Sequence, residues 1–312
     1  MYSFIKKVFE EVKDIAIPLY KILIPFVFII KILEISGIIE IVSKILEPLM
    51  SIIGLTPELG LIFVTAFLIN IYASLVLFVN LIPNIDVTVA QITILATMML
   101  ICHNLPIEST ISSAAGVNFF YTIILRLSSA FLIGFILKFI YFNFNFLNYP
   151  FKTYFTIQAP PNTLLLWFLD QFKTLAYIFL IVVIMATVLE FLKLIGIEKI
   201  FEKLFVPPLK LFGIEKEAMN IIIVGITIGL QFGGGILIKE VKKGVIDKRS
   251  AFLSISMLNL LHALIEDTIL MALVGGHISG ILFARIIFSL TICFVIFKIY
   301  NFFDSNSKTS TR

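Results

Sequence analysis

The chain has 312 residues, of which 60% are hydrophobic and 14% charged, whereas soluble domains are nearer half apolar and a quarter charged. Apolar runs of about 20 residues, enough to cross a bilayer core, recur along it. This composition excludes an ordinary soluble domain and predicts an all-α integral membrane protein. The net charge is only +4. No basic aromatic patch accompanies it, so we expect membrane lipid but no nucleic acid among its partners.

The first predicted unit covers residues 15–142. Residues 1–14 lack the short apolar core and cleavage site of a signal peptide, so we interpret them as an amphipathic lead-in to a membrane helix at about 15–35. Residues 37–55 carry Lys and Glu between apolar positions at helical spacing, which predicts an amphipathic helix in the membrane interface. Further apolar segments are expected at 58–80, about 87–103 and 117–142.

The second predicted unit, 169–303, has the same series of segments. A membrane helix at 169–192 and an amphipathic stretch at 196–214 precede apolar segments at 217–238, 250–273 and 280–302. An aromatic, proline-containing linker, 143–168, suits a membrane–water interface and joins the two units. Residues 304–312 are expected to form a polar C-terminal tail.

The two units are copies of one sequence, related by a constant offset. "SGIIEIVSKILEPLMSIIGLTPE" (36–58) matches "IGIEKIFEKLFVPPLKLFGIEKE" (195–217) without a gap. Residue types that shared hydrophobicity does not explain fall in register: Gly37/Gly196, Pro48/Pro207, Gly54/Gly213, Glu58/Glu217, His103/His262, Gly116/Gly275, Arg126/Arg285 and Tyr141/Tyr300. We infer an internal duplication.

The third segment of each unit decides the topology. "INIYAS" and "GLQFGGGIL" would weaken a helix at mid-segment, and a break there would make each run a re-entrant hairpin. The predicted hairpin tips are Asn70, Tyr72, Ser74, Gln231, Gly233, Gly234 and Gly235. With such hairpins about six helices span and the repeats are inverted. The alternative is eight spanning helices in two parallel repeats, with the glycines packing between helices.

Positive charge favours the inverted arrangement, because Lys and Arg are enriched in cytoplasmic loops. In the second unit the amphipathic stretch and the loop after the hairpin carry ten such residues, and the matching first-unit regions carry only Lys44. The ten are Lys193, Lys199, Lys203, Lys210, Lys216, Lys239, Lys242, Lys243, Lys248 and Arg249. We therefore expect a cytoplasmic-membrane protein with both termini in the cytoplasm.

Ionisable residues recur inside one apolar segment of each unit. The first copy is "CHNLPIEST", with His103, Asn104 and Glu108, and the second is "LHALIEDT", with His262, Glu266, Asp267 and Thr268. On a continuous helix His262 and Glu266 would be i, i+4 neighbours. In the first copy Pro106 interrupts the segment, which predicts a different local geometry there.

A buried acid in a membrane helix needs a partner. Arg126 and Arg285 each follow an acid of their own unit at a similar spacing, on the next helix, and we expect them to be the counter-ions. Two interpretations remain open. The residues either form structural pairs that hold neighbouring helices together, or line a polar cavity that binds a solute or relays protons.

The spacing of these residues does not match a metal or catalytic motif. "HALIE" is not the "HExxH" of a zinc protease, no cysteine pair accompanies it, and no phosphate-binding loop is present. No nucleophile stands at a suitable distance from a base. We therefore expect no metal, no cofactor and no enzymatic activity.

"SISMLNLLHALIEDTILMALVGGH" resembles the His-x-x-x-Glu-Asp-Thr box of the nucleoside recognition (Gate) domain family of membrane proteins. "GLTPELGLIFVTAFL" is similar to a segment near the start of that domain, and "CHNLPIEST" resembles a degenerate copy of the box in which Pro106 and one extra residue intervene. Related segments occur in spore maturation proteins, ferrous iron transporters and concentrative nucleoside transporters. The chain lacks the G-domain of the iron transporters and shows no clear match to nucleoside-binding motifs.

The resemblance implies inverted repeats with re-entrant hairpins and, with the buried charges, a transporter or exporter of a small solute or ion. The alternative is a non-transporting membrane scaffold or regulatory subunit of the spore-maturation type. A homo-oligomer is compatible with either function. The predicted solute path comprises His103, Asn104, Glu108, His262, Glu266, Asp267 and Thr268.

Overall fold

A computed structural model describes residues 2–152 and 164–309. The first unit contains α1 (Tyr2–Ile35), α2 (Ile38–Ile52), α3 (Pro57–Leu68), α4 (Ile71–Leu81), the 3-10 turn η1 (Ile82–Asn84), α5 (Val89–Ile101), α6 (Leu105–Ala114) and α7 (Phe119–Asn143). The second contains α8 (Leu164–Leu194), α9 (Ile197–Leu211), α10 (Lys216–Ile228), α11 (Leu230–Lys242), α12 (Lys248–Leu260), α13 (Glu266–Leu273), the π-helix η2 (Ser279–Ala284) and α14 (Arg285–Thr309).

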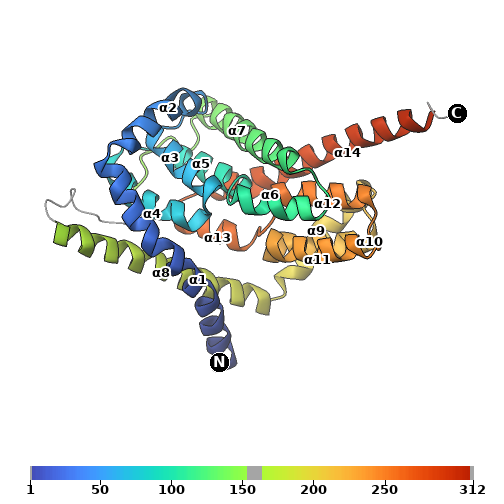
Figure 1. The fold of residues 1–312 in the computed structure, drawn as a ribbon, viewed down its shortest axis with the longest axis horizontal. Coiled ribbons are helices and arrows are strands. Elements are labelled where there is room, and N and C mark those ends of the chain that lie inside the picture. The colour runs from blue at the N-terminus through green and yellow to red at the C-terminus, as the bar shows by residue number, and fades with distance from the viewer. Residues whose placement is uncertain (1, 153–163, 310–312) are drawn as a thin grey trace.

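The elements recur with the offset of the sequence. The first residues of helices α3, α4 and α5 stand at that same offset from the first residues of α10, α11 and α12. Glycines 54 and 213 both adopt a positive φ after the amphipathic helix, at 73° and 63°. In Figure 1 the first three of these helices lie on the left of the molecule and their second-unit equivalents on the right.

Within residues 2–152 and 164–309, five helical segments are long and apolar enough to cross a membrane. They are Phe4–Ile35, Val89–Ala114, Phe119–Asn143, Leu165–Leu194 and Ser279–Phe303. The second segment is α5 together with α6, and its second-unit equivalent is α12 together with α13. The prediction of an all-α integral membrane protein is confirmed. A sixth candidate span among the described residues is the bent pair Lys44–Ile52 and Pro57–Leu68, whose helices meet at 95°.

The third segment of each unit is a helical hairpin. Helix α3 packs against α4, and α10 against α11. The α10–α11 turn is Gly229, with φ 122°, a value that favours glycine. A Cβ at Gly233 would lie 2.6 Å from the Cα of Gly225, on the other side of the turn. The two legs therefore run back along each other, so the hairpin begins and ends on one side.

The residues predicted to form the tip of the second hairpin do not lie at its turn, which is formed by Gly229. Gln231, Gly233, Gly234 and Gly235 lie inside helix α11. Gly233 and Gly234 serve helix packing, because Gly233 faces α10 and a Cβ at Gly234 would meet Ile111 of α6 at 2.7 Å, whereas a Cβ at Gly235 would meet nothing within 4 Å. Consecutive glycines here allow close approach and do not break the helix.

The first hairpin turns where the sequence predicted. The side chain of Asn70 caps α4 by accepting a hydrogen bond from the Ala73 amide at 2.8 Å. Tyr72 and Ser74 follow in the first turn of α4, where Ser74 is fully buried and donates to the Ile71 carbonyl. Only Asn70 is at the turn itself.

The segments that carry the ionisable boxes are broken helices. Asn104 and Ala263 have φ of 50° and 45°, in the left-handed region that non-glycine residues rarely adopt. His262 and Glu266 are consequently not neighbours on one helix, contrary to the prediction. The expected difference at Pro106 is also wrong, because both units break at the same position and Pro106 occupies the first turn of α6.

The hairpins bear on how the two units are related. If neither hairpin crosses the membrane, the first unit crosses with α1, with α5–α6 and with α7. Three crossings would bring the chain to the opposite side, and the second unit would then begin where the first ended. Inverted repeats therefore stay the prediction for the two units, and eight spanning helices in parallel repeats stay the alternative.

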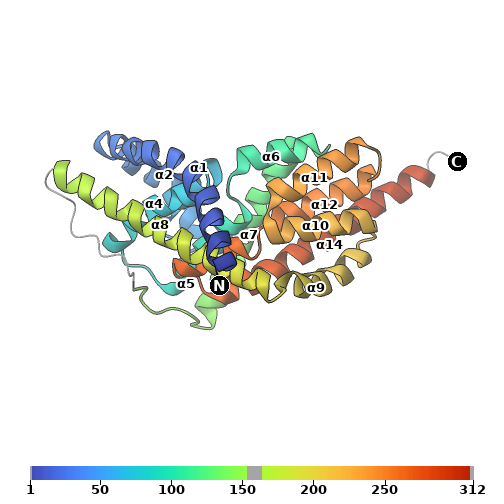
Figure 2. The ribbon, with the colours of Figure 1, turned by 90° about the horizontal axis from the view of Figure 1, so that it is seen from below.

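The long first helices depart from this regularity. Residues 2–35 form one helix, so the predicted lead-in at 1–14 is continuous with the membrane span. Helix α1 packs against α8, and both helices contact α4 of the first hairpin. Figure 2 shows α1 and α8 passing across each other near the N-terminus. At the other end, the predicted polar tail is helical to Thr309.

Candidate functional site

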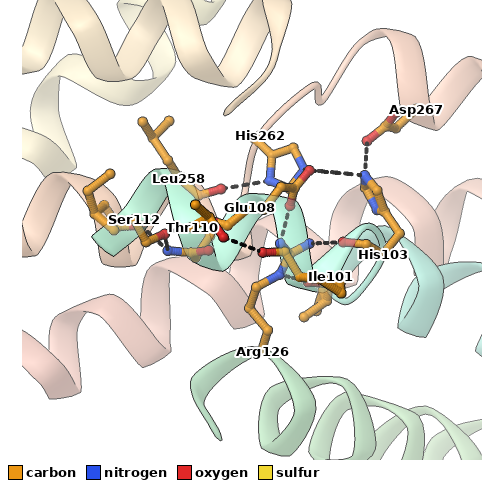
Figure 3. Close-up of polar contacts among 12 residues, drawn as sticks. Ile101, His103, Glu108, Thr110, Ser112, Arg126, Leu258, His262 and Asp267 are labelled. Carbon is orange, nitrogen blue, oxygen red and sulfur yellow. Dashed lines mark hydrogen bonds and ion pairs between the residues drawn. The ribbon is translucent and has the colours of Figure 1, made fainter. Parts of the chain in front are cut away.

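The two ionisable boxes meet at the centre of the molecule. His103 and His262 are equivalent residues of the two units, 159 residues apart in the sequence, and their Nε2 atoms lie 3.4 Å from each other. Both residues are buried, with relative exposures of 7% and 2%. Figure 3 shows the two rings close together, with Glu108 beside them and Asp267 directed at His103.

Each imidazole is fixed by the helix that precedes it. Nδ1 of His103 lies 2.9 Å from the Met99 carbonyl, and Nδ1 of His262 lies 2.7 Å from the Leu258 carbonyl. A carbonyl only accepts hydrogen bonds, so Nδ1 carries the proton in both rings. The free electron pairs of the neutral imidazoles are consequently on Nε2, and these atoms face each other.

The arginines satisfy the carbonyls that each helix break releases. Nη2 of Arg126 donates to the His103 carbonyl at 2.9 Å, and Nη2 of Arg285 donates to the His262 carbonyl at 2.7 Å. Nε of Arg126 also donates to Ile101 at 2.9 Å. Both arginines are fully buried. Because lipid offers backbone carbonyls no partner, these contacts stabilise the broken segments.

The acid of the first box is equivalent to the second acid of the second box, so the extra residue assumed in the sequence comparison is not needed. Glu108 and Asp267 are separated by the same offset as the two histidines, so they are equivalent without any extra residue. Glu108 forms the predicted ion pair with Arg126 through Oε2. Among the described residues, no ion pair joins Asp267 to Arg285. Asp267 Oδ2 and the Nε and Nη1 atoms of Arg285 are buried without a hydrogen-bond partner.

Both acids lie close to the histidines. Oε1 of Glu108 is 3.5 Å from Nε2 of His262 and 3.8 Å from Nε2 of His103. Oδ2 of Asp267 is 3.8 Å from Nε2 of His103. One ligand atom from each of His103, His262 and Asp267 fits within 4.8 Å of the others.

Glu266 has no acidic counterpart in the first unit, where Ile107 takes its place. It accepts a hydrogen bond of 3.2 Å from the hydroxyl of Tyr72, which belongs to the first hairpin. The neighbouring hydroxyl of Thr268 and its first-unit equivalent, Ser109, are both buried without a hydrogen-bond partner. The second box is therefore tied to the hairpin of the first unit.

Hydrogen bonds also join each broken segment to the hairpin of its own unit. The Asn104 amide donates to the Ala66 carbonyl at 2.9 Å, and the equivalent Ala263 amide donates to Gly225 at 3.2 Å. Asn104 itself is buried. The ends of the hairpins and the breaks consequently form one connected polar region.

A pocket of about 640 Å³ opens beside this region. Asn70, Gly229 and the two histidines line it with Glu108, Glu266 and Asp267. Its apolar side comes from α1 and from exposed side chains such as Leu68 and Ile107. Both hairpin turns and both helix breaks therefore border one cavity of a size that holds a small solute.

The sequence predicted that residues of both boxes line one solute path, but not that the two histidines touch. His103, Asn104, Glu108, His262, Glu266 and Asp267 all border the pocket, and of the predicted first-hairpin tip residues Asn70 and Tyr72 do so as well, Tyr72 with its hydroxyl on Glu266. The contact between His103 and His262 was missed. The constant offset between the two units was the available signal, because equivalent residues near an axis relating two repeats approach each other.

The fold and the site define an all-α integral membrane protein with two equivalent units around a central polar pocket. The chain is 27% identical over 191 residues to the uncharacterized membrane protein YvoD of Bacillus subtilis (strain 168). The match covers 59% of this chain and 60% of that protein. No family model matches the chain, so the resemblance to the Gate domain is not confirmed, and no solved structure matches it.

Proposed function

We propose that the protein transports a small solute across the membrane through the pocket between the two repeats. One observation carries this proposal: two hairpin turns and two helix breaks, one of each from either repeat, border the same polar cavity. Broken helices and inverted repeats are typical of secondary transporters, which place their binding sites where the repeats meet. The Gate-like box lies in this region, which supports the same class of function.

The charges around the pocket favour a cationic solute. Glu108, Glu266 and Asp267 carry three carboxylates, and Arg126 and Arg285 carry two guanidiniums. With all five groups ionised, one net negative charge is left, and a cation bound in a low-dielectric site is stabilised by it. Nucleoside transport gains no specific support from these residues.

Access to the pocket is tested without knowing the solute. Native Cys102 and Cys293 are replaced by alanine, and Asn70→Cys is labelled in vesicles of both orientations with a membrane-impermeant maleimide. Transport through alternating states predicts labelling from either side. Ser74→Cys is the matched control, because Ser74 is fully buried one turn further along α4 and should stay unlabelled.

Labelling of Asn70→Cys from one side alone would refute an alternating pocket and favour the membrane scaffold or regulatory subunit. That alternative has its own support, because the arginine–carbonyl contacts brace the broken helices. Uptake into proteoliposomes of radiolabelled solutes, including nucleosides and metal cations, then compares the wild type with Glu266→Gln. Uptake that this change leaves untouched would remove Glu266 from the path.

A further inference from the structure

We propose that the histidine pair is a binding site for a divalent transition-metal ion. The ligands are Nε2 of His103 and of His262 with Oδ2 of Asp267, and Oε1 of Glu108 stands in the fourth position. Binding is independent of the proposed transport. The further conclusion that this ion is the carried or coupled solute rests on the proposed function.

The orientation of the imidazoles is the first reason. Because both Nδ1–H groups donate to carbonyls of the preceding helix turn, two Nε2 electron pairs point at each other across 3.4 Å. Two electron pairs at this distance repel unless a proton or a cation lies between them. Imidazole whose other nitrogen is held by a carbonyl is the usual form of a metal-ligating histidine.

The distances are the second reason. Two nitrogens bound to a tetrahedral Zn²⁺ at about 2.0–2.1 Å lie about 3.3 Å apart, close to the 3.4 Å between the two Nε2 atoms. The two acids lie at similar distances from the histidines. Glu108 Oε1 lies 3.5 Å from His262 Nε2, and Asp267 Oδ2 lies 3.8 Å from His103 Nε2. The ligand atoms of His103, His262 and Asp267 lie within 4.8 Å of one another, so small side-chain movements would bring these three to one ion beside Oε1 of Glu108.

The unpartnered carboxylate is the third reason, and it is independent of the histidines. Asp267 is 6% exposed, and its Oδ2 atom has no hydrogen-bond partner. A buried carboxylate oxygen without a partner is costly. Figure 3 shows this oxygen directed at the His103 ring, so the same ion that separates the two imidazoles would satisfy it.

The donor set selects the class of ion. Imidazole nitrogens suit Zn²⁺, Fe²⁺, Co²⁺ and Ni²⁺, whereas Mg²⁺ and Ca²⁺ prefer oxygen ligands throughout. Two nitrogens and two carboxylate oxygens therefore favour a transition metal. The ligands come from different repeats, so the ion would also link the two halves of the molecule.

The test measures Zn²⁺ and Co²⁺ binding to the purified full-length chain in detergent, by calorimetry and by the visible spectrum of bound Co²⁺. We expect one ion per chain, a tetrahedral Co²⁺ spectrum, and no competition from Mg²⁺ in excess. His103→Ala and His262→Ala should each weaken binding by more than ~100-fold. His277→Ala is the matched control, since the third histidine of the chain bonds Ser279 outside the cluster and should not affect binding.

Asp267→Asn keeps the experiment decisive should a histidine variant fail to fold, because Oδ2 makes no hydrogen bond that the change would remove. It should weaken binding while the size-exclusion profile stays that of the wild type. Absence of binding to the folded wild type would overturn the proposal. Binding that is retained in Asp267→Asn and also in a folded histidine variant would overturn it as well.

The two proposals fail separately. Zn²⁺ binding without flux into proteoliposomes would leave the metal site standing and refute metal transport. Labelling of Asn70→Cys from both sides, in a protein that binds no transition metal, would leave transport standing and refute the metal site.

Discussion

Replacement of the two equivalent arginines by glutamine should affect the stability of the protein unequally. Arg126 pairs with Glu108 and donates to the Ile101 and His103 carbonyls. Arg285 donates to the His262 carbonyl, while its Nε and Nη1 atoms have no hydrogen-bond partner. The two side chains are fully buried at matching positions, so they differ in their partners and not in their exposure.

The expected magnitudes follow from those partners. Removing one member of a buried ion pair leaves the other charge uncompensated and costs about 3–5 kcal/mol. Arg126→Gln should reach this range, because Glu108 is buried and would lose its counter-ion. Arg285→Gln loses one hydrogen bond to a carbonyl, which costs about 1–3 kcal/mol. The first change should therefore lower the free energy of unfolding by about 2 kcal/mol more than the second.

Reversible unfolding in mixed micelles, followed by circular dichroism, measures both losses against the wild type. Adding Glu108→Gln to Arg126→Gln removes the uncompensated charge, so the double variant should recover about 1–3 kcal/mol relative to the sum of the single changes. Equal losses for the two arginine variants, or strict additivity in the double variant, would refute the assigned difference between the pairs.

Two further predictions concern the fold. Gly233→Ala should strongly reduce the amount of folded protein, because the added Cβ would lie 2.6 Å from the Gly225 backbone. Gly235→Ala should be neutral or slightly stabilising, because the added Cβ would have nothing within 4 Å. Thermal unfolding compares the two variants, and equal behaviour would contradict the packed hairpin. Reporter fusions within 80–88 and 239–249 should report opposite sides of the membrane, and a common side would contradict the inverted repeats.

The duplication was the most informative feature of the sequence. Glycine, proline, histidine and arginine recurring at one offset predicted two equivalent units, and the equivalent glycines at 54 and 213 adopt the same left-handed conformation. Composition predicted the spanning helices for the same reason, since long apolar runs have few alternatives in a membrane. These predictions depend on residue types whose physical requirements are narrow.

The helix breaks were harder to predict, because periodicity does not distinguish a continuous helix from two short ones. Ala263 adopts a φ of 45° although alanine favours helix, and its amide bonds to the hairpin rather than within α12. The three glycines suggested a break, yet they lie within α11, and Gly233 and Gly234 allow it to pack closely on its neighbours. Tertiary hydrogen bonds and packing decide both cases, and neither is visible within a single segment.

The histidine contact shows how a duplication can create a site that neither copy contains. A residue near the axis relating two repeats necessarily approaches its own equivalent, so one histidine in the ancestral unit becomes a pair in the duplicated chain. The acids then make the site unequal. Glu108 is held by Arg126, Asp267 Oδ2 is unpartnered, and Glu266 occurs only in the second unit, where Tyr72 of the first hairpin binds it. A ligand at the symmetric histidine pair would therefore meet different chemistry on its two sides, and this asymmetry could distinguish one direction of movement from the other.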